Sequence, residues 1–267
     1  MLSVISPSKF KEEHVQNLVQ KMMKKTGFFR KKPLEDIIHK NMVWMPYYRI
    51  QFNYRRSEKN LIQRYGETGR SETVLNAMFC GCVKSEKELI TLFRPNYLKH
   101  KIARHSPQSE EIVGSTFNID FEGVLGSFLK RLKEVKDELN EFRPELSKIR
   151  KRLSRYSKIL PMKDLIDKER KLSEKVARLE ALRNVLNMCL NVNEDVRSIE
   201  VRGHDVFFYP ILVVTLKHKE NRVERYFIVD LVEKGSIRKH LSYDKGLTEL
   251  CNKNSGCKET VIRSIKP

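Results

Sequence analysis

The clearest chemical feature of this sequence is a run of positive charge between residues 143 and 158. The run reads RPELSKIRKRLSRYSK and holds seven Lys or Arg side chains against one acidic side chain, Glu145. Lys and Arg neutralise phosphates, and a cluster of them gives salt-sensitive affinity for nucleic acid. We therefore predict a phosphate-binding surface composed of Arg143, Lys148, Arg150, Lys151, Arg152, Arg155 and Lys158. The alternatives are the solvated outer face of a helix and a surface that docks another protein.

The chain as a whole is strongly basic. Its 267 residues include 53 Lys and Arg against 34 Asp and Glu, a formal net charge of +19. Such a surplus attracts polyanions, with nucleic acid as the first candidate and an acidic membrane surface as the second. Hydrophobic residues make up 40%, which is enough for a folded core. No long apolar run or secretory signal is visible, so we expect a cytoplasmic protein without a transmembrane segment.

Acidic residues in the last third of the chain raise the possibility of a metal-dependent nuclease. Such enzymes gather carboxylates around a hard cation. Glu200, Asp205 and Asp230 lie on or beside expected strands, but their spacing matches no recognisable nuclease pattern. Phosphate loops and the motifs of serine hydrolases and zinc proteases are absent. The sequence therefore assigns no catalytic residue and no cofactor, and leaves open whether these three acids form a site.

Cysteines could in principle hold zinc. Cys80 and Cys82 form one close pair, and Cys251 and Cys257 form another. Structural zinc sites space their ligands as C-x2-C to C-x4-C, and neither pair has this spacing. An odd total of five cysteines over a long chain also makes no disulfide framework. We expect no metal, and we interpret Cys80 and Cys82, which would share one face of a strand, as small core residues.

The basic run belongs to a segment with sustained heptad periodicity. Apolar residues from Phe128 to Leu160 are spaced alternately four and three apart, and the spacing resumes from Leu165 to Leu190. This pattern predicts two long helices, separated at Pro161, that form an antiparallel coiled-coil hairpin. Each limb of about 30 residues would reach roughly 45 Å. Pro144 is expected to kink or loosen the first limb.

The segments on either side of the hairpin share a pattern. Residues 36–54 align without gaps on residues 200–218. The matched positions include Pro46 on Pro210 and Trp44 on Phe208. In each copy, which continues beyond the aligned block, we expect a strand, a proline-started strand, a third strand and a short helix. In the first copy the third strand is expected in SETVLNAMFCGCVK, residues 71–84. The similarity suggests an internal duplication, and the alternative is convergence on an ordinary strand pattern.

The first aligned segment is rich in aromatic residues. One face of its expected strand carries Tyr48, Ile50, Phe52 and Tyr54. Sheets that stack nucleic-acid bases display their aromatics on a face open to solvent. The matched strand ILVVTLK has no aromatic residue, so we expect the four side chains to pack in the core. Trp44 and Tyr47 lie on the other side and are expected as candidate surface contacts.

Two shorter helices are predicted in the first half of the chain. The first is capped by Ser6, has Pro7 at its first position, and stops at Gly27. Ser85 and Glu88 have the spacing of a capping box, which predicts the start of the second.

Together these patterns predict an α+β protein with two similar strand-strand-strand-helix halves that form a mixed or antiparallel sheet body. The predicted segments are 1–122 (N-terminal helix and first half), 123–191 (inserted basic coiled-coil hairpin) and 192–267 (second half, packed with the first). We expect a non-enzymatic protein that binds DNA or RNA, or a nucleic-acid-bound assembly, through the hairpin. One alternative is a protein–protein adaptor whose hairpin contacts a partner helix or a second copy. The other is a divergent metal-dependent nuclease.

Overall fold

The computed structural model describes residues 2–5, 12–26, 32–56, 68–76, 78–79, 85–100, 102–105, 120–156, 162–193, 196–232, 242–256 and 258–259. The helices are α1 (Glu12–Met22), α2 (Glu86–Leu92), the 3-10 helix η2 (Pro95–Lys99), α3 (Phe121–Tyr156), α4 (Lys163–Cys189) and α5 (Lys245–Lys253). The strands are β1 (Leu2–Ile5), β2 (Lys25–Thr26), β3 (Lys32–Pro33), β4 (Glu35–Arg56), β5 (Thr68–Asn76), β6 (Ile102–His105), β7 (Val196–His218), β8 (Glu224–Asp230) and β9 (Ser242–Tyr243). The predicted α+β class is confirmed.

The main sheet places β5, β4, β7, β1 and β6 side by side in that order, with β8 beside β7 and β9 beside β8. The pairs β1–β6, β7–β8 and β8–β9 are antiparallel, whereas β1 and β7 are parallel. Strands β2 and β3 form a separate antiparallel pair.

By compactness the chain divides into two units, each built from separate stretches. Unit 1 comprises Met1–Ile50, Val74–Ile119 and His204–Pro267, and unit 2 comprises Gln51–Thr73 and Asp120–Gly203. The strands β4, β5 and β7 each contribute residues to both units.

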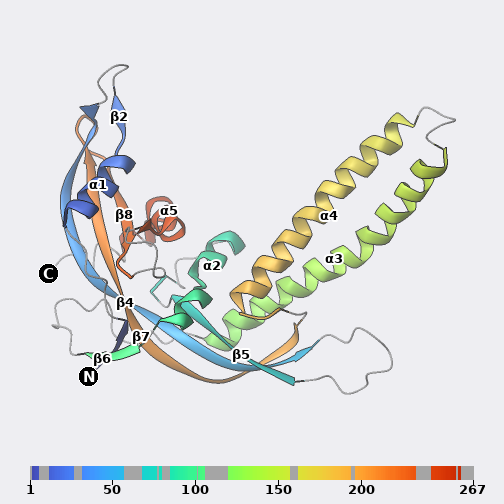
Figure 1. Cartoon of the computed structure of the whole chain (residues 1–267), viewed down its shortest axis with the longest axis horizontal. Coiled ribbons are helices and arrows are strands. Elements are labelled where there is room, and N and C mark those ends of the chain that lie inside the picture. Colours follow the sequence, from blue (N-terminus) through green and yellow to red (C-terminus); the bar gives the residue numbers. More distant parts are fainter. Residues whose placement is uncertain are drawn as a thin grey trace. The chain divides into compact units, whose positions relative to one another are not determined.

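In unit 1, helices flank strand β8. Val15 and Val19 of α1 pack against hydrophobic residues of β7 and β8. Thr248 of α5 accepts a hydrogen bond from the Ile228 backbone amide at 3.1 Å. Figure 1 shows α1 and α5 on either side of β8. The helical spacing of Val15 and Val19 thus serves to cover the sheet, as an amphipathic helix does.

The aromatic segment folds as the central part of β4. The expected core residues Tyr48, Ile50, Phe52 and Tyr54 are all buried. The expectation for Trp44 and Tyr47 is wrong, because these side chains are only 3% and 0% exposed. Residues 43–48 are buried without alternation, which is the pattern of a strand covered on both faces. The aromatic side chains up to Tyr48 therefore build the core of unit 1, whereas Phe52 and Tyr54 are buried in unit 2.

Pro46 and Pro210 lie inside β4 and β7, so the prediction that each starts a separate strand is wrong. Proline lacks a backbone donor and normally disrupts a central strand. On one side of β7 the partner strand changes close to Pro210, since β1 pairs with Phe208 and β8 pairs from Ile211 onward. Pro210, which has no backbone N–H to donate, therefore lies where β7 changes its partner strand. A proline destabilises the sheet least at such a position.

The N-terminal region differs from the expected single helix. Helix α1 is preceded by β1, which the pattern did not predict. It ends at Met22, before β2, so the predicted stop at Gly27 is wrong. The predicted cap at Ser6 and Pro7 lies outside the described residues.

The predicted start of the second helix is confirmed. Ser85 caps α2, and its side-chain oxygen accepts a hydrogen bond from the Glu88 backbone amide at 3.3 Å. The preceding strand, expected to continue to Lys84, ends at Asn76 as β5.

Replacing Ser85 by alanine is expected to lower the free energy of unfolding by about 1 kcal/mol, because one amide of the first turn loses its acceptor. Urea unfolding of the full chain measures this difference. Ser85→Asp keeps an acceptor and should lie within about 0.5 kcal/mol of the wild type. Equal losses in both variants would show that the cap hydrogen bond is not the cause.

A buried ion pair fixes the end of α1 in unit 1. Arg225 donates to both carboxylate oxygens of Glu35, at 2.5 and 2.6 Å, and to the Met22 carbonyl at 2.9 Å. Glu35 also accepts from the Lys24 backbone amide at 2.8 Å. Since Glu35 is only 2% exposed, its charge is stabilised by these donors rather than by water.

A second buried ion pair connects α2 and α5. Arg94, just after α2, donates from Nη2 to Asp244 at 2.8 Å, and both side chains are about 85% buried. Asp244 also caps α5 by accepting from the Leu247 amide at 2.9 Å. One carboxylate therefore serves two structural roles.

Candidate nucleic-acid interface

Unit 2 holds the two longest helices of the described chain, α3 and α4, which lie side by side (Figure 1). Residues late in α3 meet residues early in α4, so the helices run antiparallel. Arg150 pairs with Glu169 at 2.7 Å, and Arg143 pairs with Glu180 at 2.5 Å. The buried seam residues of α3 include Phe128, Leu132, Val135, Leu139, Leu146 and Ile149. The predicted pair of helices is therefore present, whereas coiled-coil packing in the strict sense stays a prediction.

Pro144 lies inside α3 without ending it. The helix continues from Phe121 to Tyr156. Residues 157–161, which include Lys158 and Pro161, lie outside the described part of the chain.

The predicted phosphate-binding residues fall into two groups, those that pair with a carboxylate of α4 and those that form no ion pair with a described residue. Arg143 and Arg150 are each paired with a carboxylate of α4, so their charge already helps to hold the two helices together. The sequence offered a signal for this division, since Glu169 and Glu180 lie opposite these arginines once the helices are antiparallel.

The four other described members form one surface, which we call the basic stripe: Lys148, Lys151, Arg152 and Arg155. Their spacing of i, i+3, i+4 and i+7 places them on one face of α3. All four are exposed, and none forms an ion pair with another described residue. At 1.5 Å per residue the stripe extends about 10 Å along the helix. Its place near the C-terminus of α3 also favours positive charge through the helix dipole.

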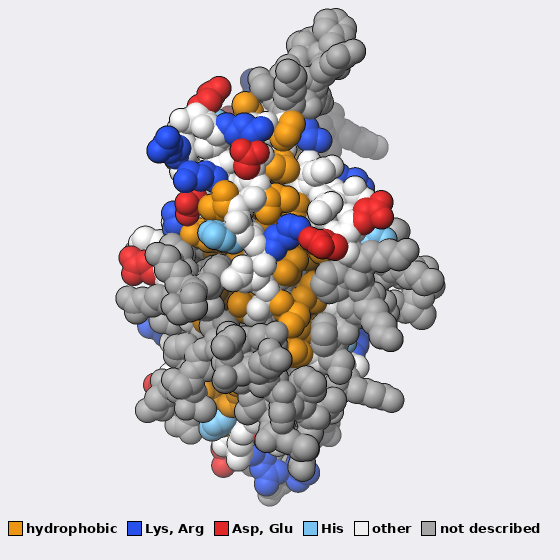
Figure 2. Space-filling model, turned by 90° about the vertical axis from the view of Figure 1, so that its left-hand side faces the viewer, with side chains coloured by type: hydrophobic (Ala, Val, Ile, Leu, Met, Phe, Trp, Pro, Cys, Tyr) orange, Lys and Arg blue, Asp and Glu red, His pale blue; other side chains and the backbone are white. Residues whose placement is uncertain are grey.

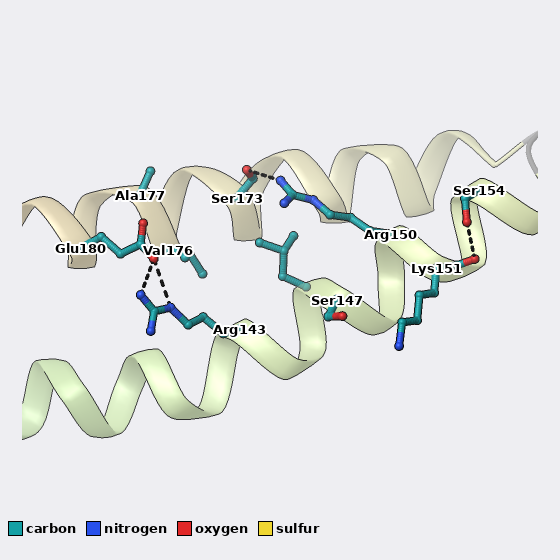
Figure 3. Close-up of a pocket in the computed structure, with 10 residues that line it drawn as sticks. Arg143, Ser147, Arg150, Lys151, Ser154, Ser173, Val176, Ala177 and Glu180 are labelled. Atoms are coloured by element: carbon teal, nitrogen blue, oxygen red, sulfur yellow. Dashed lines mark hydrogen bonds and ion pairs between the residues drawn. The ribbon is translucent and has the colours of Figure 1, made fainter. Parts of the chain in front are cut away.

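Beside the basic stripe, α3 and α4 border an open groove of about 660 Å³. Figure 3 shows Arg143 and Arg150 extending toward α4, where Arg150 donates to Ser173 at 3.0 Å. Lys151 lines the same groove but points away from α4. Lys151 is therefore the residue of the basic stripe that also borders the groove.

The acidic residues considered for a nuclease are in different environments. Asp230 is 3% exposed and accepts a hydrogen bond from the Tyr209 hydroxyl at 2.7 Å. Burial and then the charge of Asp230 raise the pKa of Tyr209, which keeps this hydroxyl protonated as the donor. Glu200 and Asp205 are exposed. Among the described residues, no three His, Cys, Asp or Glu side chains gather closely enough to hold a metal ion.

Of the four cysteines considered for zinc, the structure describes one. Cys251 is fully buried in α5. Cys80, Cys82 and Cys257 lie outside the described residues.

The described residues of one face carry charges of both signs. Figure 2 shows a face on which hydrophobic side chains form a central band and charged side chains of both signs lie beside it. The described side chains of this face therefore form no continuous basic surface. A local concentration such as the basic stripe is the better candidate for polyanion binding.

No helix of the described chain is long and apolar enough to cross a membrane. No protein-family model, curated protein or solved structure matches the chain. The candidate function therefore depends on the geometry and charge of the described residues.

Proposed function

We propose that this protein binds nucleic acid, DNA or RNA, through the basic stripe, without strong sequence preference. The observation that carries the proposal is the contrast between the unpaired cations of the stripe and their paired neighbours Arg143 and Arg150. Exposed Lys and Arg contact phosphates and thereby position a nucleic acid without reading its bases. A stripe of about 10 Å spans about three phosphates of one strand at 3.4 Å each.

The test is binding of labelled single-stranded and double-stranded DNA and RNA between about 50 and 200 mM salt. With three or four phosphate contacts, the slope of log K against log salt for duplex DNA is expected at about −3 to −4. A variant with all four stripe residues changed to Gln should bind at least about tenfold more weakly at the lowest salt, and its slope should be reduced by about 3.

The matched control changes four exposed cations elsewhere on α3 and α4 to Gln: Lys130, Lys133, Lys171 and Arg178. It removes the same charge and should retain most of the affinity. Equal losses in both variants would assign the binding to net charge rather than to the stripe. Absence of binding by the wild type at the lowest salt would overturn the proposal.

A protein–protein adaptor is the second candidate. Ile166, Val185 and Met188 on α4 are 53%, 38% and 69% exposed, which offers apolar contacts to a partner. An adaptor could also self-associate through the apolar stripe from Leu172 to Leu190, but this stripe is less available, because Leu179, Leu186 and Leu190 are buried. The adaptor becomes the leading proposal if the wild type binds none of the nucleic acids.

The third candidate is a nuclease. Adding Mg²⁺ to a parallel binding series tests it, because cleavage of the labelled nucleic acid would then appear.

We also propose that the chain contains an internal duplication and that α3 and α4 pack as a coiled-coil hairpin. Trp44 and Phe208, matched in the alignment, pack against each other. The order β4, β5, α2 resembles the order β7, β8, α5, and the ion pair of Arg94 with Asp244 connects the two helices. For the hairpin, the buried seam and its flanking ion pairs support coiled-coil packing. We place the protein in the cytoplasm on the sequence expectation alone.

A further inference from the structure

A second basic surface lies on the sheet segments of unit 2. The neighbouring strands β5, β4 and β7 form it with residues 68–73, 51–56 and 196–203. One side of these segments is covered, since Phe52 and Tyr54 are buried. On this covered side, Ser71 and Thr73 donate hydrogen bonds to the backbone carbonyls of Asn191 and Cys189, at the end of α4. Strand alternation directs the intervening residues to the opposite side.

We call this opposite side the outer sheet face. Its side chains are Gln51, Asn53, Arg55, Arg70, Glu72, Ser198, Glu200 and Arg202. Asn53 donates to Glu200 at 3.5 Å, a contact between β4 and β7 on this face. Phe52 and Tyr54 also border the grooves on this face, but they are only 1% and 8% exposed, so the described residues present no open aromatic platform here.

Three arginines from three strands dominate the outer sheet face. Arg55, Arg70 and Arg202 are exposed, and none forms an ion pair with another described residue. They line two grooves of about 560 and 520 Å³, and Arg70 and Arg202 take part in both. Cavities of this size suit small ligands or a few nucleotides. Since neighbouring strands lie about 4.8 Å apart, backbone positions on β5 and β7 are about 10 Å apart across the face.

We propose that the outer sheet face is a second contact for nucleic acid and that it holds a single strand. This inference rests on the proposed function. A guanidinium binds phosphate with two parallel hydrogen bonds and also stacks on a base, so arginines can replace the missing aromatic platform. The side-chain amides of Gln51 and Asn53 offer donors and acceptors to unpaired bases.

The charge pattern favours a single strand over a duplex. Glu72 and Glu200 lie among the arginines and line the same grooves. The phosphates of one flexible strand can follow the guanidinium groups, whereas the rigid second strand of a duplex brings further phosphates toward these carboxylates.

The experiment compares the wild type with the Arg55→Gln, Arg70→Gln, Arg202→Gln triple variant. The probes are a labelled oligo-dT of about 15 nucleotides and a duplex of the same length. The triple variant should bind the oligo-dT at least about tenfold more weakly, with a salt slope reduced by about 2. Its affinity for the duplex should stay within about twofold of wild type, because the basic stripe is intact.

The matched control is the Arg178→Gln, Arg183→Gln, Arg197→Gln variant, which removes three arginines of unit 2 away from the outer sheet face. It should bind the oligo-dT like the wild type, and circular dichroism confirms that both variants are folded. If the triple variant also binds like the wild type, the outer sheet face is not a contact, while the stripe proposal stands. If the wild type binds neither probe, both proposals fail.

A polyglutamate competitor tests the class of ligand. It should displace the oligo-dT far less effectively than unlabelled oligo-dT, because a peptide chain offers neither bases nor phosphates to the arginines. Two results together would overturn the single-strand assignment and identify a general anion site. Both competitors would displace the oligo-dT equally from the wild type, and neither would do so from the triple variant.

Discussion

The Asp244→Ala variant is expected to be about 3 kcal/mol less stable than the wild type. Removing the carboxylate leaves the buried Arg94 guanidinium without its counter-ion and leaves the Leu247 amide of α5 without its cap. Burial alone lowers the pKa of Arg94, but Asp244 raises it, and the net pKa lies above the ordinary value. A guanidinium stays protonated in proteins, so the variant must bury an uncompensated charge. The remaining bonds from Arg94 to the Thr91 and Phe93 carbonyls limit the loss.

Urea unfolding followed by tryptophan fluorescence measures this effect directly. Trp44 is the single tryptophan of the chain and is buried in unit 1, where the ion pair lies. Asp244→Asn keeps an acceptor for the cap and removes only the charge, so its loss should be about half as large. A wild-type unfolding midpoint for Asp244→Ala would contradict the structural role of this pair.

The second large effect is expected at Glu35 and depends on pH. Burial by itself raises the pKa of this carboxyl, but the bonds from Arg225 and the Lys24 amide, together with the nearby positive charges, leave it below its ordinary value of 4.5. Because the folded pKa is lower than the unfolded one, the stabilisation is fully present above pH 4.5. It is lost as the pH falls through the folded value.

Glu35→Gln should therefore be about 2 to 3 kcal/mol less stable than the wild type at neutral pH. The difference should shrink progressively below pH 4.5, where the wild-type carboxyl becomes protonated as well. Urea unfolding at a series of pH values measures it. Glu12→Gln is the control, since Glu12 pairs with Lys40 but is 73% exposed, and it should show no comparable dependence. A Glu35→Gln difference that is constant with pH would refute this account.

Local patterns predicted the elements whose stability is local. The heptad spacing predicted α3 and α4, the Ser85 cap predicted α2, and the alternation around Ile50 predicted part of β4. The burial of Trp44 and Tyr47 was missed, because it depends on chain segments remote in sequence that cover the second face of the strand.

The candidate sites show the same limit. The run of basic residues predicted where positive charge gathers. Only the pairing of α3 with α4 separates Arg143 and Arg150, which pair with carboxylates, from the stripe residues, which form no ion pair with another described residue. The outer sheet face combines Arg70 of β5 with Arg202 of β7, and no local pattern relates residues so distant in the chain. A site of this kind can be recognised only when the order of the strands in the sheet is known.

The position of β4 beside β7 has a consequence for biosynthesis. About 140 residues separate the end of β4 from the start of β7, so its partner leaves the ribosome much later. At 5 to 20 residues per second, this delay lasts roughly 7 to 28 seconds. During that time β4, a strand rich in aromatic residues, lacks its neighbour β7 and, of the two strands described beside it, can pair only with β5, a condition that favours aggregation. Nascent chains should therefore depend on chaperones until translation passes β7, and the long inserted helices lengthen that dependence.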